Sequence, residues 1–172
     1  MTTIIGTQWQ WGCEIAADGR TTSDGRVYDG SHMVKVVLRN EYLIAAAGSG
    51  GACDYITHAW RPPAFRGDSE YEFFVAYLSP HLQKALSLND FLPLKDDDGL
   101  QILVAVNGYV FQIESDGTVL HSDSGFYGIG TGAPYALGAI EAGAETSEAL
   151  EIASMYDIYT GPPFTRVKQV KQ

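Results

Sequence analysis

The first half of the chain consists mainly of short segments in which apolar and polar residues alternate, separated by glycine-containing turns such as Asp18-Gly19 and Asp24-Gly25. A period of two predicts β-strands, because successive side chains of a strand point to opposite faces of a sheet. We therefore expect four N-terminal strands, arranged as an antiparallel meander, at residues 3–7, 13–17, 34–38 and 42–46.

The period changes after the glycines of residues 48–51. Apolar residues then recur at helical spacing up to Trp60, before Pro62-Pro63. A second helix is expected at 70–86, with one broad apolar face and a bend at Pro80. The remaining pattern predicts strands at 101–106, 109–114, 118–121, 126–129 and 164–170, and helices at 134–142 and 147–156.

The order of these elements predicts a layered fold. Strands, two helices, strands, two helices and a final strand pack most economically as two sheets face to face, with a helical layer outside each. The chain has 172 residues and lacks any repetitive or proline-rich tract, so we expect one domain over residues 1–172. The predicted class is α+β, as a four-layer α/β/β/α sandwich.

The charge balance restricts the partners. Eleven basic residues against twenty-one acidic ones give a net charge of −10, which repels nucleic acid and anionic lipid surfaces. No uncharged run approaches the roughly 20 residues that span a bilayer, and the first residues lack the features of a signal peptide. We expect a cytoplasmic protein in which Cys13 and Cys53, forty positions apart, are buried free thiols.

Thr2 is the first candidate for chemistry. Removal of Met1 would leave a threonine that carries both a hydroxyl and a free α-amine. An α-amine with a reference pKa of about 7.7–8.0 is a useful general base near neutral pH, and a threonine hydroxyl beside its own amine is a known activated nucleophile. Many proteins begin with Met-Thr for no chemical reason, so this feature needs support from others.

Asp18 and Lys35 are two further candidates. Asp18 ends an apolar strand and precedes Gly19, which is also typical of an ordinary turn. Lys35 stands among apolar residues on the face shared with Met33 and Val37, so it is either a gatekeeper on an edge strand or a buried cation that needs a carboxylate partner. If Asp18 is that partner, the lysine charge would ease proton loss from a nearby hydroxyl.

Glycine-rich turns complete the set of candidates. Residues 46–54 place Gly48, Gly50 and Gly51 between a buried strand and a helix, which suits an oxyanion hole made of backbone N–H groups. Phosphate binding is less well supported, because the P-loop lysine is missing. Thr131 and Thr160 each lie beside a glycine at a helix boundary, where capping alone would explain them.

Taken together, six segments resemble the bacterial HslV peptidase and proteasome β subunits, which are N-terminal nucleophile hydrolases, from end to end. These segments are TTIIG, AADGRTT, KV, AAGSGGACD, GIGTGAPYALGA and EALEIASMYDIYTG. The fifth segment and the Ile-Tyr-Thr near the C-terminus are most similar to HslV, whereas the Asp-x-x-Thr-Gly ending is closer to the proteasome.

The resemblance implies a role for each candidate. Thr2 would be both nucleophile and base, Asp18 would hold the charged Lys35, and the Gly50 N–H would form the oxyanion hole. Hydrogen bonds near the amine would come from Thr131, Asp157 and Thr160, and the substrate would bind against Thr22, Met33, Gly48 and Ala52. The Thr22 backbone would pair with an extended peptide as an added strand.

The resemblance also implies cofactors and partners. The chemistry would need no cofactor, and a structural Na⁺ or Mg²⁺ ion would be held by the main-chain carbonyls of Ser154, Asp157 and Thr160. Relatives of this kind form double rings of twelve or fourteen subunits, some with an AAA+ ATPase such as HslU, and hydrolyse unfolded proteins or peptides. The alternatives are an inactive ring scaffold and a small-molecule amidase with the same fold.

Two segments depart from the family pattern. Residues 8–11, Gln-Trp-Gln-Trp, are aromatic where relatives are usually polar. Residues 61–99, where the family makes its ring contacts, match poorly, so the ring size and the ATPase partner stay open.

Overall fold

The computed structural model describes residues 2–28, 34–92 and 99–171. In these residues, two antiparallel sheets carry most of the strands. The first sheet has the order β10-β1-β2-β11, with β1 at Thr3–Trp9, β2 at Gly12–Ala17, β10 at Phe126–Gly130 and β11 at Thr165–Val170. The second has the order β5-β6-β7-β8-β9, with bounds Val36–Arg39, Tyr42–Gly48, Leu100–Val106, Tyr109–Glu114 and Val119–Leu120.

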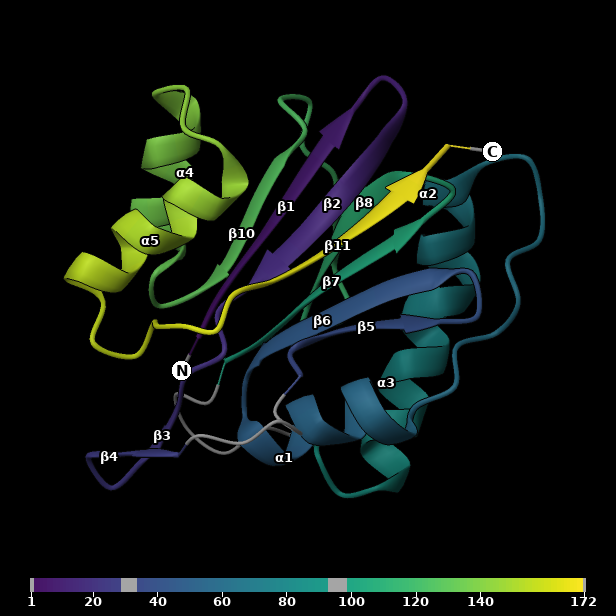
Figure 1. The fold of residues 1–172 in the computed structure, drawn as a ribbon. Coiled ribbons are helices and arrows are strands. Elements are labelled where there is room, and N and C mark those ends of the chain that lie inside the picture. The colour runs from purple at the N-terminus through teal and green to yellow at the C-terminus, as the bar shows by residue number, and fades with distance from the viewer. Residues whose placement is uncertain (1, 29–33, 93–98, 172) are drawn as a thin grey trace.

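The two sheets pack face to face through their apolar inner faces (Figure 1). Alternation along β1 and β6 directs Ile4 and Leu43 into this central core, where they meet Ile15, Leu103 and Ile129. Each is completely buried. The strand period read from the sequence is therefore the pattern that builds the middle of the sandwich.

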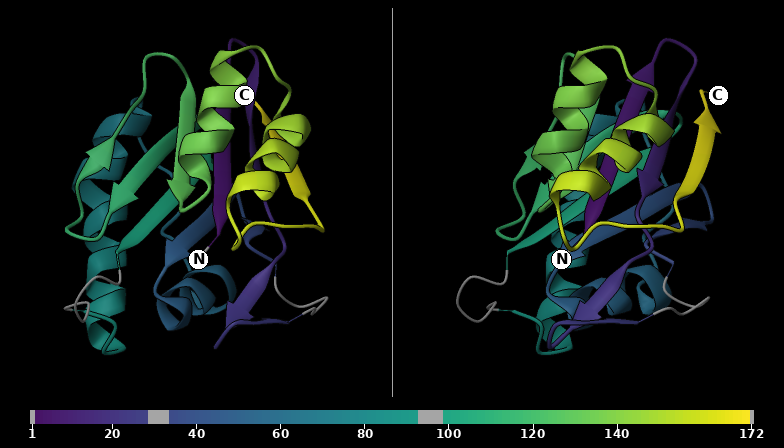
Figure 2. Two further views of the ribbon diagram at one scale, coloured as in Figure 1. Left: turned by 90° about the vertical axis from the view of Figure 1, so that its left-hand side faces the viewer. Right: turned by 60° about the vertical axis from the view of Figure 1, so that its left-hand side comes forward.

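Two helices cover the outer face of the first sheet. Helices α4 (Ala133–Glu141) and α5 (Thr146–Tyr156) pack on it mainly through small side chains, including Ala136, Ala149 and Ala153. Alanines permit a close approach to Ile5 and Ala16 of the sheet. Figure 2 shows both helices on one side of the strands, away from the other helices.

The second helical layer covers the outer face of the other sheet. It contains α1 (Gly50–Asp54), which continues into the wide π-helical turn η1 (Tyr55–Ala59), and α2 (Glu70–Phe73), η2 (Phe74–Leu78) and α3 (Ser79–Leu88). In η2 the Ser79 N–H bonds to the Phe74 carbonyl, five residues back. This wide turn lies directly before Pro80, which lacks an N–H. The sequence predicted a bend at Pro80, and the structure has a π-helical turn there.

The four layers confirm the predicted α/β/β/α sandwich. The expected N-terminal meander is wrong, because β1–β2 and β5–β6 are hairpins of different sheets. The second edge of β2 pairs with β11, with Ile15 opposite Val167, so β2 has no free edge for β5. A short hairpin, β3 (Thr21–Ser23) and β4 (Arg26–Tyr28), was not expected.

Two further expectations concern the thiols and the membrane. Both cysteines are free, as the sequence predicted; Cys13 is buried as expected, whereas Cys53 is only partly buried. Among the helices that the structure describes, none is long and apolar enough to cross a bilayer.

Candidate active site

Thr2 directly precedes β1, an inner strand of the first sheet, and is 5% exposed. Its position is fixed from both sides, because β1 pairs with β2 and with β10. Thr3 lies opposite Gly130, and the Thr3 carbonyl accepts the N–H of Asp18 at 3.0 Å. The chain direction therefore brings the Thr2 hydroxyl to the end of β2, where Asp18 follows the strand.

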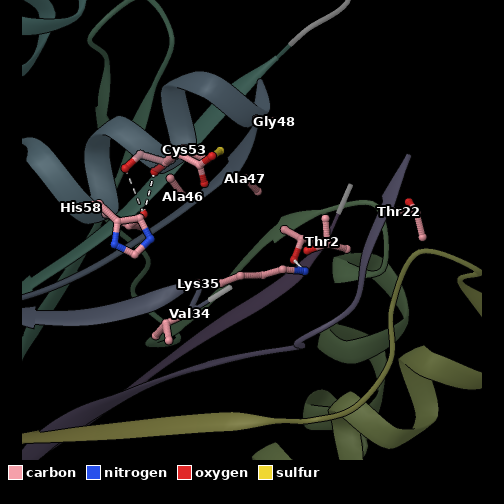
Figure 3. Close-up of a pocket in the computed structure, with 13 residues that line it drawn as sticks. Thr2, Thr22, Val34, Lys35, Ala46, Ala47, Gly48, Cys53 and His58 are labelled. Atoms are coloured by element: carbon pink, nitrogen blue, oxygen red, sulfur yellow. Dashed lines mark hydrogen bonds between the residues drawn. The ribbon is translucent and has the colours of Figure 1, made fainter. Parts of the chain in front are cut away.

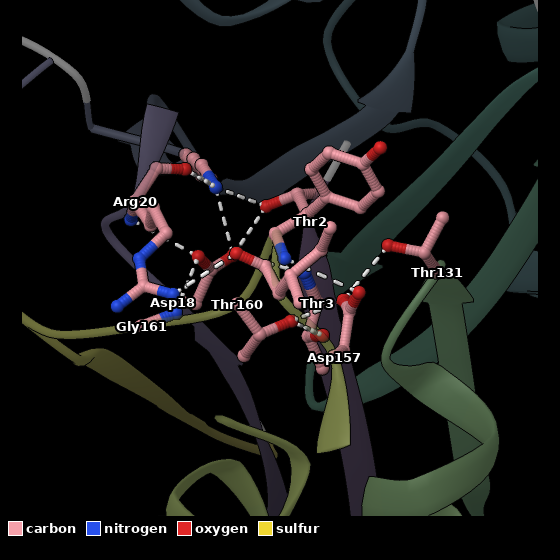
Figure 4. A network of polar contacts seen from close by, with 11 residues as sticks. Thr2, Thr3, Asp18, Arg20, Thr131, Asp157, Thr160 and Gly161 are labelled. Carbon is pink, nitrogen blue, oxygen red and sulfur yellow. Dashed lines mark hydrogen bonds and ion pairs between the residues drawn. The ribbon is translucent and has the colours of Figure 1, made fainter. Parts of the chain in front are cut away.

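Asp18 is the acceptor at the centre of the site (Figure 4). Its Oδ1 accepts the Thr2 hydroxyl and the Thr3 N–H, the latter at 2.8 Å. Its Oδ2 accepts the N–H groups of Arg20 at 3.0 Å and Gly161 at 3.2 Å. A carboxylate with this many donors, and only 1% exposed, is held in one orientation.

Lys35 is the cation that Asp18 requires. Its Nζ lies 2.7 Å from Asp18 Oδ1 and 2.7 Å from the Arg20 carbonyl, and it also donates to the Thr2 hydroxyl. Burial lowers the pKa of the Lys35 ammonium below its ordinary value, while the charge of Asp18 acts in the opposite direction. Of the two interpretations of this lysine, the structure supports the buried, paired cation.

Lys35 itself lies just before β5, which begins at Val36, so the strand expected at 34–38 begins two residues later. The Lys35 side chain bonds to the end of the other sheet. This contact ties the two sheets together at the site.

A second hydrogen-bond network lies beside Thr3. Asp157 Oδ2 accepts the hydroxyls of Thr131 at 2.8 Å and Thr160 at 2.6 Å, and Thr160 Oγ1 lies 2.5 Å from Thr3 Oγ1. Asp157 and Thr160 are buried, whereas Thr131 is exposed. A Cβ at Gly132 would lie 2.0 Å from Thr3 Oγ1, so a glycine is needed at that position. The structure thus brings the three predicted residues together beside Thr3, the residue that follows Thr2.

A cavity of about 300 Å³ opens beside Thr2 and Lys35 (Figure 3). The glycine-rich turn forms part of its wall through Gly48 and Gly50. Gly48 has a φ of +124°, a conformation that favours glycine, and Gly50 is the exposed first residue of α1. The N–H of Gly50 has no acceptor within its helix, since the first N–H groups of any helix lack one.

The predicted substrate-binding residues are placed differently. Thr22 and Gly48 line the cavity, whereas Ala52 is completely buried in the outer core and does not line it. Met33 lies outside the described residues. The sequence reasoning missed Thr3, Arg20 and Gly161, and also most of the helical wall of the cavity, which is formed by Cys53, Asp54, Thr57 and His58. The i, i+4 spacing of Asp54 and His58 after the glycines was the available signal.

The carbonyls expected to hold a structural cation lie at and after the end of α5. Ser154 is in the last helical turn, where carbonyls lack an intrahelical donor, and the Asp157 carbonyl accepts the Thr160 N–H at 3.0 Å. Carbonyl oxygens suit Na⁺ or Mg²⁺, although the Arg20 guanidinium already donates to the Ile158 carbonyl of this loop at 3.0 Å. The described residues contain no group of three His, Cys, Asp or Glu side chains that would hold a metal. The structural ion stays a prediction.

The two antiparallel sheets, packed face to face with a helical layer outside each, define a proteasome-type fold. Solved structures with this fold cover nearly the whole chain. The Thiobacillus denitrificans BPH, a bacterial proteasome homologue, has a TM-score of 0.78 and 24% sequence identity over 99% of this chain and 98% of its own. A structure of that protein is a complex with epoxomicin.

Two other solved structures have a similar fold. HslV from Trypanosoma brucei has a TM-score of 0.65 and 17% identity, over 96% of this chain and 98% of its own. Anbu, an ancestral β-subunit from Yersinia bercovieri, has a TM-score of 0.72 and 13% identity, over 96% and 80%. No family model and no curated protein matches the sequence. At these identities, the likeness shows the fold.

Proposed function

We propose that this chain is a threonine peptidase that uses Thr2 as its nucleophile after Met1 is removed. The observation that carries the proposal is the set of contacts that joins the Thr2 hydroxyl to both Lys35 and Asp18. An ammonium ion held against a threonine hydroxyl eases loss of its proton. A proteasome-type fold without this arrangement would support only a scaffold.

The reaction follows from these positions. The Thr2 hydroxyl attacks a peptide carbonyl while its proton passes to the α-amine of the same residue, which then protonates the leaving amine. The Gly50 N–H, at the cavity wall, donates to the oxyanion that forms. The product is an ester of Thr2 with the acyl part of the substrate. A water molecule, which gives its proton to the α-amine, hydrolyses the ester and restores the hydroxyl.

Other residues would position the substrate and the amine. The hairpin β3–β4 carries Thr22 at the cavity, and an extended peptide would add to β3 as a further strand. Thr131, Asp157 and Thr160 would hold the polar surroundings of the amine in place. The substrate class proposed is unfolded protein or peptide.

The proposal includes an assembly. We propose a homo-oligomer of two stacked rings, with twelve or fourteen subunits, that confines the active sites in a chamber in the cytoplasm. The support is the fold shared with HslV and the bacterial proteasome homologue. An AAA+ ATPase such as HslU would be the partner that unfolds folded proteins and delivers the unfolded chains to the chamber.

An active-site label tests the nucleophile. Epoxomicin, the ligand of the similar BPH structure, is the probe, and mass mapping should place one adduct on Thr2 of a chain that has lost Met1. Thr2→Ala should prevent the adduct and reduce peptidase activity to below about a thousandth, while Thr2→Ser, which keeps a hydroxyl and an amine, should retain some activity. Both variants should keep the oligomer, since the change removes few contacts.

The outcomes separate the alternatives. Activity of more than a few per cent in Thr2→Ala would contradict the assignment. Rings without an adduct or activity would favour the inactive scaffold. An adduct on Thr2 together with hydrolysis of small amides, but not of peptides or casein, would favour the amidase.

A further inference from the structure

The cavity beside Thr2 has a wall that the proposed reaction does not use. One face of the helical segment α1–η1 forms this wall, and Figure 3 shows Cys53 and His58 across the cavity from Thr2 and Lys35. The substrate side chain next to the attacked carbonyl, the P1 side chain, would project toward this wall. The residues of the wall therefore determine which P1 side chains fit.

Part of the cavity wall is apolar and consists of small residues. Ala46 and Ala47 line it from β6 and Cys53 from the helix. Burial raises the pKa of the Cys53 thiol to about 12, so this side chain is neutral and behaves as a small apolar group. Small walls and a volume of about 300 Å³ leave room for the aliphatic stem of a long side chain.

Of the charged groups around the cavity, Lys35 is already paired, whereas Asp54 is unpaired within the described residues and free to bind a substrate. The three N–H donors of Lys35 are directed to Asp18, the Arg20 carbonyl and Thr2, so none is left for an acidic substrate group. In contrast, the exposed carboxylate of Asp54 forms no hydrogen bond or ion pair with residues 2–28, 34–92 or 99–171. The available charge at the helical wall is negative.

Thr57 adds a second acceptor. Its hydroxyl donates to the Cys53 carbonyl at 2.8 Å, and the proton is therefore used within the helix. The hydroxyl oxygen can only accept a further hydrogen bond from the cavity side. Lysine and arginine side chains are donors without acceptors, so their groups match a wall of this kind.

We propose that the cavity selects substrates with a basic P1 side chain, arginine or lysine. The stem lies along Ala46, Ala47 and Cys53, and the charged end is paired with Asp54. This inference rests on the proposed peptidase function, because P1 is defined by the carbonyl that Thr2 attacks. A glutamate at P1 meets the Asp54 carboxylate, and a leucine leaves that carboxylate without a partner.

Four fluorogenic peptides that differ only at P1, with Arg, Lys, Leu or Glu, test the selection. The kcat/KM values for Arg and Lys should exceed those for Leu and Glu by about tenfold or more. Asp54→Asn, which removes the charge and keeps the shape, should reduce the Arg-to-Leu ratio by about tenfold. Asp68→Asn is the matched control, because Asp68 is exposed and does not line the cavity, and it should leave the ratio unchanged.

A binding measurement makes the test independent of catalysis. Fluorescence anisotropy of labelled peptides with the Thr2→Ala oligomer should show tighter binding of the Arg peptide, and Asp54→Asn in the same background should remove the difference. Equal affinities, or a preference for Leu or Glu in either assay, would overturn the inference. Selective binding of the Arg peptide, together with a wild-type protein that forms no epoxomicin adduct on Thr2, would support an acidic pocket for basic side chains and refute the peptidase proposal.

Discussion

At the scale of single residues, Asp18 and Lys35 are a mutually dependent pair. The side chain of Asp18 is completely buried and that of Lys35 is 14% exposed. Removing one member of a buried ion pair leaves the other charge without a partner, which costs more than the pair contributes when intact. The site and the stability of the fold are therefore linked through these two residues.

We expect Lys35→Ala and Asp18→Ala each to lower the free energy of unfolding by about 3–5 kcal/mol and to remove most activity. Denaturant titration of both single variants and the double variant measures the coupling, and the double variant should be little worse than either single one. Lys168→Ala is the control, because this exposed lysine lies 3.7 Å from Glu14, which keeps its ion pair with Arg166, and an exposed cation of this kind contributes about 0–1 kcal/mol. Fully additive losses would contradict a coupled pair.

The pKa of Lys35 leads to a prediction about pH. Burial lowers this pKa, and the reaction needs the charged form, so activity should fall as pH rises through a value below that of an ordinary lysine. Asp18→Asn removes the attraction that raises the pKa, and should move the alkaline limb of kcat/KM to still lower pH. An alkaline limb that stays in place in Asp18→Asn would show that Lys35 is not the titrating group.

The sequence predicted the ion pair at the centre of the site better than the main-chain groups that surround it. Asp18 and Lys35 stood out because a charge among apolar residues requires an explanation. Gly161 and Arg20 contribute main-chain groups, and any residue type carries those groups. The Gly161 N–H reaches Asp18 only because the fold joins positions 143 apart in sequence, a distance over which local patterns carry no signal.

At the scale of elements, the start of α4 is set by its contact with the second hydrogen-bond network. Gly132→Ala should lower activity strongly, because the added Cβ would lie 2.0 Å from Thr3 Oγ1 and 2.6 Å from Thr160 Oγ1. Gly138→Ala, in the middle of the same helix, meets no atom within 4 Å and should stabilise the protein by about 1 kcal/mol. Activity assays and thermal unfolding of both variants check this. Full activity in Gly132→Ala would contradict the network's role.

Apolar periodicity together with the turn residues located most strands and helices to within one or two residues, although inner strands such as β2 and β6 are buried on both faces. The pairing of the strands was predicted less well. The segments at 13–17 and 34–38 have equivalent patterns, and only the later segment at 165–170 decides that β2 pairs with β11. The hairpin β3–β4 was missed because its short strands lie largely at the surface and bury no apolar face.

At the scale of the whole molecule, we propose that the exposed apolar residues of α2 and η2 contribute to the contacts between subunits of the ring. Tyr71, Val75 and Tyr77 are 49%, 48% and 65% exposed. Multi-angle light scattering should show a large oligomer in the wild type, and Val75→Glu should shift it toward the subunit mass of 18.7 kDa. An active wild-type species of subunit mass would contradict the chamber.

The three tryptophans of the chain are distributed very unevenly between surface and core. Trp60 is 1% exposed and donates to His81 Nδ1 at 3.1 Å, whereas Trp9 and Trp11, in the β1–β2 hairpin, are 41% and 68% exposed. The intrinsic fluorescence therefore has two components, a blue-shifted one from the helical layer and a red-shifted one that iodide can quench. Without any label, the first reports on unfolding, and the second reports on whatever comes to cover the hairpin.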